Sequence, residues 1–293
     1  MKKSQNSKSI YYLGLLFVIA IWSLYPVITK NLLTVYTPSL WSTASSLIAV
    51  VTLLILGRKK LKLLNWNYFK VAVPIGIFYS TAGLTQNYGL TMTTPAVCAF
   101  LENLTCVCVP ILMFILAKQK ITLLKALAAL LCLAGGFVLC GGDLSGGFGP
   151  GVILCALAGV FYSVNIAGTG IYAKNLDTGL YLLIQFSVQF VIALGYSIFF
   201  VDAWKFSFAP QHLGALVGIV LVSSVLCWLI RTACLKKLDP SFIAVAMPFT
   251  SVFTGIISIL VGADTLSFAL VAGAVLITAA IILSGLADNK QKT

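Results

Sequence analysis

Ten long apolar segments dominate this chain, and they constrain its fold more than any other feature. Most run about 18–24 residues, and the charged residues fall largely between them. A helix rising ~1.5 Å per residue needs about 20 residues to cross ~30 Å of hydrocarbon, whereas membrane β-strands are about half as long and alternate in polarity. We therefore expect spanning helices at 10–29, 39–56, 71–90, 95–117, 123–140, 150–173, 179–200, 212–235, 241–261 and 266–286.

Composition excludes a water-soluble domain. Hydrophobic residues make up 60% of the chain and charged residues 9%, whereas a soluble domain usually carries about 25% charged residues. The first apolar segment follows a basic Met-Lys-Lys start, as in a signal peptide. It has no obvious small-x-small cleavage site and leads straight into further spans, so we interpret it as a retained helix.

The net charge of +12 is an orientation signal. With the N-terminus inside and ten spans following, sixteen of the nineteen Lys and Arg residues fall on the cytoplasmic side. Lys30 and Lys205 fall outside, and Arg231 lies within a span. The positive-inside rule then predicts a multi-pass protein of the cytoplasmic membrane with both termini cytoplasmic. Nucleic-acid binding is not needed to explain the charge.

No pattern for a cofactor, a metal or ATP stands out in the sequence. All eight cysteines fall within apolar spans without the spacing of a zinc site, which favours packing roles. The chain contains no Walker-type phosphate loop. The energy for any transport would therefore come from a gradient or from the concentration of the substrate itself. We expect no cofactor, and a monomer or homodimer in the lipid bilayer.

The sequence contains an internal repeat. Its most glycine-rich segment, 135–151, lies near the midpoint, and a shift of 145 residues places Pro95 on Pro240 and Leu90 on Leu235. We divide the chain into repeats at 1–142 and 143–293. Five helices per repeat is an odd number, so the second copy enters the membrane from the opposite side. This predicts an all-α membrane protein of ten helices in two inverted five-helix repeats, an arrangement common in secondary transporters.

Several stretches resemble a known family. One runs Gln86-Asn-Tyr-Gly-Leu-Thr-Met-Thr-Thr-Pro-Ala96 and continues through Phe100-Leu101 to Val107-Cys-Val-Pro110; another runs from Phe161-Tyr-Ser163 to Thr169-Gly-Ile-Tyr-Ala173. They resemble the third-to-fourth and the sixth helices of EamA-type carriers of the drug/metabolite transporter superfamily. Trp22-Ser23 with Lys30 is similar to the Trp-Gly start of that family, with Ser replacing Gly. The resemblance implies gradient-driven transport of metabolites such as amino acids.

Glu102 is the only carboxylate inside a long apolar stretch. An acid at that depth costs about 2.5–3.5 kcal/mol by insertion scales, and intramembrane acids serve as substrate ligands or proton relays. A purely structural hydrogen bond to a neighbouring helix is the alternative. Glu102-Asn103 replaces the small polar residues usual in relatives, which suggests a specialised pocket.

The 145-residue shift places Gln86 on Arg231. Tyr79, Gly83 and Gln86 share one helix face, and Ser224, Trp228 and Arg231 repeat the spacing, so both triplets are predicted to face one cavity. Arg231 could instead snorkel to the cytoplasmic surface. Glu102 and Arg231 differ in depth by about 12 Å, which leaves room for an amino acid whose ammonium meets Glu102 and whose carboxylate meets Arg231. Gln86 is level enough with Glu102 for a hydrogen bond.

Other polar and aromatic groups within the spans are candidates for the same cavity. Asn165, Gln185 and Gln189 could either face a substrate or bond between helices. Prolines inside spans predict kinks and hinges: Pro26, Pro74, Pro110 and Pro248. Aromatic residues that could wall the cavity are Trp22, Tyr25, Tyr79, Phe161, Tyr162 and Trp228.

The function we expect is alternating-access secondary transport of a small organic metabolite, an amino acid first and a cationic compound second. Proton coupling through Glu102 is a further expectation. The alternative on the same fold is a carrier of nucleotide-linked sugars or lipid-linked metabolites. An integral membrane enzyme is disfavoured because the spans lack a catalytic constellation, and a channel because they lack polar stripes. The predicted substrate residues are Trp22, Tyr79, Gln86, Glu102, Asn103, Tyr162, Asn165, Gln185, Trp228 and Arg231.

Overall fold

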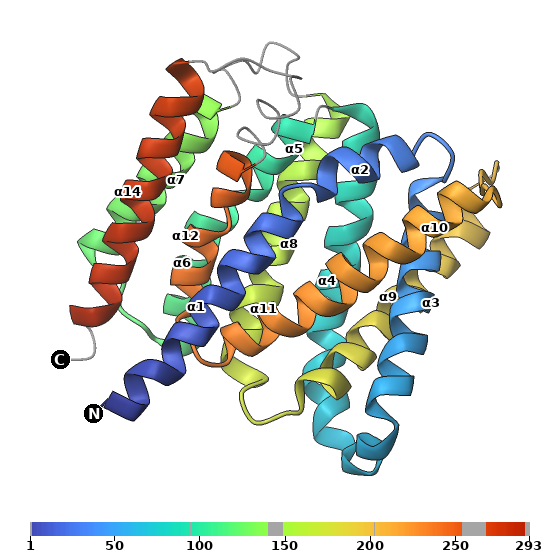
Figure 1. Ribbon diagram of the computed structural model, residues 1–293, viewed down its shortest axis with the longest axis horizontal. Coiled ribbons are helices and arrows are strands. Elements are labelled where there is room, and N and C mark those ends of the chain that lie inside the picture. The colour runs from blue at the N-terminus through green and yellow to red at the C-terminus, as the bar shows by residue number, and fades with distance from the viewer. Residues whose placement is uncertain (1, 94, 140–148, 202, 254–267, 291–293) are drawn as a thin grey trace.

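The fold is helical throughout the part of the chain that the structure describes. A computed structural model describes residues 2–93, 95–139, 149–201, 203–253 and 268–290, and no strand occurs among them (Figure 1). The helices are α1 Lys2–Trp22, α2 Tyr25–Leu32, α3 Pro38–Gly57, the 3₁₀ helix η1 Arg58–Leu63, α4 Trp66–Met92, α5 Pro95–Glu102, α6 Thr105–Ala117, α7 Leu123–Leu139, α8 Pro150–Tyr172, α9 Thr178–Phe200, α10 Pro210–Ile219, the π-helix η2 Val220–Leu226, α11 Cys227–Leu235, α12 Pro240–Ala246 and α14 Phe268–Lys290.

These helices follow the predicted apolar segments and make the chain a multi-pass membrane protein. Among the described residues, six helical stretches are long and apolar enough to cross a membrane: Ser9–Leu32, Pro38–Leu63, Val97–Ala117, Pro150–Tyr172, Thr178–Phe200 and Pro210–Leu235. Helix α4 is not among them, because it carries several polar groups in its C-terminal half. The predicted ninth segment continues beyond residue 253, and the predicted repeat boundary at 142/143 lies outside the described residues.

Helix starts are set by proline and aspartate. Proline occupies the first turn of α2, α3, α8, α10 and α12, where its missing N–H breaks no helical hydrogen bond. Asp177 caps α9 by accepting from the N–H groups of Gly179 and Leu180, and Asp239 caps α12 in the same way. The loops between these helices thereby end at defined residues.

The two halves of the chain interlock. Helix α3 packs on α9 and α7 packs on α14, and each of these pairs joins helices that correspond under the 145-residue shift (Figure 1). Helix α4 packs on α8, and its counterpart α11 packs on α1. Glycine permits the closest of these contacts: a Cβ at Gly135 would lie 2.8 Å from Ile277, and one at Gly89 would lie 2.5 Å from the Cys155 sulfur. This exchange of partners is the pattern expected of two copies related by a two-fold axis.

Within the described parts of the predicted spans, three helices are interrupted. The helical hydrogen bonding breaks between α1 and α2 at 23–24, between α5 and α6 at 103–104, and after α12 at 247–248. Irregular backbone at membrane depth is tolerated only where protein buries it or where it lines a cavity. All three interruptions lie next to residues that line a central cavity.

Candidate functional site

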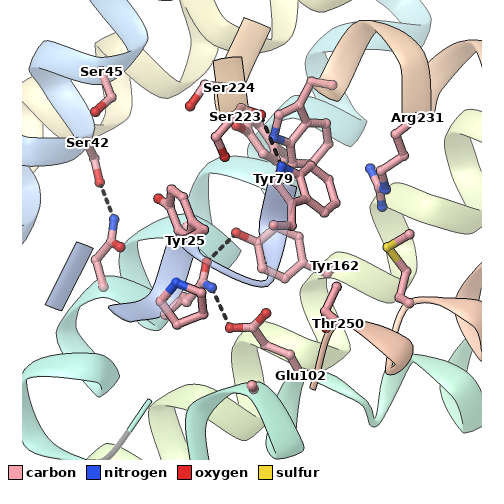
Figure 2. Close-up of a pocket in the computed structure, with 18 of the residues that line it drawn as sticks. Tyr25, Ser42, Ser45, Tyr79, Glu102, Tyr162, Ser223, Ser224, Arg231 and Thr250 are labelled. Carbon is pink, nitrogen blue, oxygen red and sulfur yellow. Dashed lines mark hydrogen bonds between the residues drawn. The ribbon is translucent and has the colours of Figure 1, made fainter. Parts of the chain in front are cut away.

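A cavity of about 150 Å³ lies among the interrupted helices (Figure 2). It takes side chains from both halves of the chain. Eight of the ten predicted substrate residues line it: Trp22, Tyr79, Gln86, Glu102, Asn103, Tyr162, Trp228 and Arg231. The two triplets predicted to face one cavity do so, since Gly83 and Ser224 line it as well.

Glu102 is the acidic pole of this cavity. It is the last residue of α5, at the interruption before α6. Gln86 donates a hydrogen bond from Nε2 to Glu102 Oε1, as the sequence predicted, and accepts one at Oε1 from the Tyr162 hydroxyl at 2.7 Å. The Cys98 sulfur lies 3.3 Å from the same carboxylate oxygen. Both contacts that the described residues make end on Oε1, which leaves Oε2 for another partner.

Gly159 of α8 allows α8 to pack closely against the end of α5 that carries Glu102. A Cβ at Gly159 would lie 2.7 Å from the carbonyl oxygen of Leu101 and 3.3 Å from the Cα of Glu102. A contact this close is possible only for glycine, because any side chain would collide with backbone. The same α8 helix contributes Tyr162, one turn further on, to the hydrogen bond with Gln86.

Arg231 is the basic pole, and it points into the cavity, so the snorkelling alternative does not hold. Its side chain is 2% exposed. Its guanidinium carbon lies 4.5 Å from the ring centre of Trp228 and 5.7 Å from that of Trp22, which is cation–π distance. Nη1 donates to Asn165 Oδ1 at 3.4 Å, and Nε has no partner among the described residues.

No carboxylate neutralises Arg231 within the described part of the chain. The two ion pairs found there, Lys60–Asp177 at 2.8 Å and Lys125–Asp239 at 3.4 Å, both lie outside the cavity lining. A buried charge without a counter-charge is costly. Glu102 and Arg231 therefore present an acidic and a basic group to the same space, neither of them ion-paired among the described residues (Figure 2).

Asn165 and Gln185 stand one layer behind the cavity, and the structure corrects the prediction that they contact a substrate directly. Both are 1% exposed and neither lines the cavity. Asn165 holds Arg231 and donates to Gln185 Oε1 at 3.4 Å, and Gln185 donates to the Tyr181 hydroxyl at 2.7 Å. Helix packing turned these groups toward each other, so they orient the guanidinium through Asn165.

Aromatic rings form the wall between the two poles. Trp228 lies 4.5 Å from Tyr79 and 5.5 Å from Trp22, measured between ring centres. The Trp22 indole N–H donates to the Ser223 carbonyl at 3.1 Å, within η2, whose π-helical turn shifts the usual backbone hydrogen bonds. Tyr25 also lines the cavity, whereas Phe161 packs on Phe78 and does not line it.

Several lining residues were absent from the sequence prediction. The principal ones are Trp41, Ser42, Ser45, Asn87, Phe186 and Thr250. The 145-residue shift contained part of the missing signal, since it pairs Trp41 with Phe186 and Thr105 with Thr250. Gln189, predicted only as a polar group within a span, lines the cavity too. Among the described residues, no group of three His, Cys, Asp or Glu side chains is placed to hold a metal ion.

Interrupted helices around a polar cavity, in an all-helical membrane fold of two similar halves, define the class of protein as a membrane transporter. The chain belongs to the EamA-like transporter family, whose sequence profile matches residues 9–141 and again residues 149–286. A solved structure described as "Crystal structure of protein" is similar with a TM-score of 0.78 and 18% identity, covering 97% of this chain and 99% of that chain. That likeness shows the fold. No curated protein matches the sequence.

Proposed function

We propose that this chain is a secondary active transporter that carries a small zwitterionic metabolite, an amino acid first, across the cytoplasmic membrane. Ten helices in two inverted five-helix repeats alternate access to the central cavity, and both termini lie in the cytoplasm. Glu102 binds the ammonium group and exchanges a proton, and Arg231 binds the carboxylate. Aromatic rings between them cover the apolar part of the substrate.

The observation that carries this proposal is an acidic and a basic side chain in one cavity, neither of them ion-paired among the described residues. Arg231 is buried, its Nε has no partner among the described residues, and its guanidinium fork matches the geometry of a carboxylate. Glu102 keeps Oε2 free of the contacts that bind Oε1. A molecule with an ammonium and a carboxylate satisfies both poles at once, whereas a cation or an anion alone leaves one pole unpaired.

Cavity size favours an amino acid over the larger alternatives on this fold. A cavity needs ~10–15 Å³ to hold one water molecule. The 150 Å³ of this cavity therefore corresponds to about ten water molecules. That space suits a molecule of amino-acid size. A nucleotide-linked sugar is several times larger, and the described cavity lining offers a single basic side chain for its phosphates.

A cycle of charge deletions on protein and ligand tests the assignment of the two poles. Binding to purified protein is measured by thermal shift with glutamine, with the amide of its α-carboxyl group, and with its deaminated analogue. Glu102→Gln is expected to weaken glutamine binding about 10- to 100-fold, since a charged hydrogen bond is worth ~1.5–3 kcal/mol. The same substitution should leave binding of the deaminated analogue unchanged. Arg231→Gln should weaken glutamine binding equally and spare the α-amide.

Asn165→Ala serves as the matched control for Arg231→Gln, because it removes a supporting contact and keeps the charge. It should weaken glutamine binding less than Arg231→Gln does. Equal losses for all three ligands in either charge-deleted variant would contradict the assignment of the poles. Counterflow of glutamine in proteoliposomes, saturable and without unitary currents, distinguishes a carrier from a channel.

A further inference from the structure

A second polar region lines the cavity on α3 and α4, on the side away from Arg231. Ser42 and Ser45 lie on one face of α3, and Asn87 of α4 donates to Ser42 Oγ at 3.0 Å (Figure 2). All three residues line the cavity. Neither Glu102 nor Arg231 makes a hydrogen bond with them among the described contacts, so this region is separate from the two charged poles.

The side-chain oxygen of Asn87 is an acceptor without a donor. Ser42 uses its own hydroxyl proton on the Pro38 carbonyl at 3.0 Å, so it can only accept from Asn87. This fixes the amide orientation, with Nδ2 toward Ser42 and Oδ1 directed elsewhere. Asn87 is 4% exposed, and Oδ1 is buried with no partner among the described residues. Buried amide oxygens are rarely left in that state.

Ser45 differs from its neighbours on α3 in the same respect. Ser42, Thr43 and Ser46 each donate to the carbonyl four residues earlier, which is the usual fate of a hydroxyl within a helix. Ser45 makes no such bond, and its buried Oγ has no partner in the described part of the chain. Among the described residues of α3, Ser39 and Ser45 both have a buried hydroxyl without a partner, and of these two Ser45 lines the cavity.

We propose that Asn87 and Ser45 form a subsite for the side chain of the substrate, and that this side chain is a neutral carboxamide or hydroxyl. The inference rests on the proposed function and names the substrate class within it: polar uncharged amino acids. Asn87 Oδ1 accepts a hydrogen bond from the side chain, and the Ser45 hydroxyl donates one to it. A carboxamide offers one donor and one acceptor to these two atoms, and a hydroxyl offers both from a single oxygen.

Charge excludes the acidic and basic amino acids from this subsite. The charged side chains among the described lining residues are Glu102 and Arg231, and the α-ammonium and α-carboxylate groups use both. A third charge on the substrate would be buried against neutral partners, which is unfavourable. An aliphatic side chain fits the space but leaves both Asn87 Oδ1 and Ser45 Oγ unpaired.

Isosteric pairs of amino acids test the subsite. Binding to purified full-length protein is measured by thermal shift for asparagine against leucine and for threonine against valine, because each pair has nearly the same shape. The wild-type protein is expected to bind the polar member about five- to tenfold more tightly. Ser45→Ala should reduce this preference to about twofold or less without weakening the binding of leucine or valine.

Ser46→Ala is the matched control, since Ser46 donates to its own helix and does not line the cavity. It should keep the wild-type preference. Equal binding of asparagine and leucine by the wild-type protein, or a preference that survives Ser45→Ala, would overturn the subsite while leaving amino-acid transport intact. Failure of all four amino acids to bind would overturn the proposed function, and the subsite with it.

Discussion

At the scale of single residues, Glu102 combines two roles in the proposal, ligand and proton carrier. The titratable groups near it include the Cys98 thiol, from α5, the Tyr162 hydroxyl, through Gln86, and the Tyr25 hydroxyl, from α2. No basic side chain among the described residues pairs with it. In the proposal, Glu102 itself is therefore the group that exchanges the proton.

Replacing Glu102 by Gln should separate exchange from accumulation. With an imposed pH gradient, proteoliposomes containing the wild-type protein are expected to accumulate glutamine above equilibrium. Those containing Glu102→Gln should exchange glutamine in counterflow at saturating concentration and accumulate none, because the carboxamide cannot carry the proton. Radiolabelled uptake with and without the gradient measures both. Glu102→Asp is the control that retains the acid, and accumulation by Glu102→Gln with unchanged pH dependence would refute the coupling.

Sequence patterns located the charged residues well and their neighbours less well. The helical spacing and the 145-residue shift placed Gln86 and Arg231 on one cavity, and the structure agrees. They could not decide whether Asn165 and Gln185 face substrate, because that depends on how α8 and α9 rotate against each other. The sequence did not single out Asn87 for a similar reason. Its Oδ1 has no partner among the described residues because Ser42 donates its hydroxyl proton to the Pro38 carbonyl and accepts from Asn87 Nδ2.

At the scale of helices and loops, the positions of prolines predicted helix starts but did not predict every helix interruption. Pro38 and Pro150 start helices, as proline in a first turn does. The interruption at 103–104 contains no proline, and Pro110 lies inside a continuous α6. The close approach of α8 at Gly159 accompanies that interruption. Such a contact joins residues far apart in the chain, so local sequence could not reveal it.

The loop between α8 and α9 is held from two sides. Lys236, directly after α11, donates to the Leu176 carbonyl at 2.6 Å and to Thr178 Oγ1 at 2.7 Å, while Lys60 of η1 pairs with Asp177 at 2.8 Å. Burial lowers the pKa of Lys236 to about 8; Asp177 opposes this shift and Lys237 adds to it. Between about pH 8 and 10.4 the unfolded chain keeps a proton that the folded protein has released. Stability from this group therefore rises with pH across that window.

Lys236→Met should expose this dependence. The melting temperature of the wild-type protein relative to the variant is expected to rise by roughly 1–2 °C between pH 7 and pH 9.5, because deprotonation relieves the cost of burying the charge. Thermal unfolding in detergent at both pH values measures it. Lys174→Met is the control, since Lys174 is exposed in the same loop. A difference that stays constant with pH, or falls, would contradict the expected sign.

At the scale of the whole molecule, the lysines that hold loops together lie at two opposite ends of the helical bundle. The Lys60–Asp177 pair and the Lys236 bonds gather η1, the α8–α9 loop and the end of α11 together. At the other end Lys30 donates to the Thr93 carbonyl, and Thr37 N–H donates to the Lys205 carbonyl at 2.9 Å. The first turn of α1 and the last turn of α14 lie on the same side of the bundle (Figure 1). The fold thus places Lys30 and Lys205, the two lysines predicted to lie outside the cell, at the opposite end of the bundle from Lys60 and Lys236.

The positions of these lysines predict the orientation of the protein in the membrane. The end with η1 and the α8–α9 loop should face the cytoplasm, because Lys and Arg flanking spans are retained on that side. A reporter active only in the cytoplasm should work when fused after residue 293, and one active only outside should work when inserted near Lys205. The matched control exchanges the two reporters between the sites, and both should then be silent. Activity of the external reporter at the C-terminus would mean that the second half does not end where an inverted repeat requires.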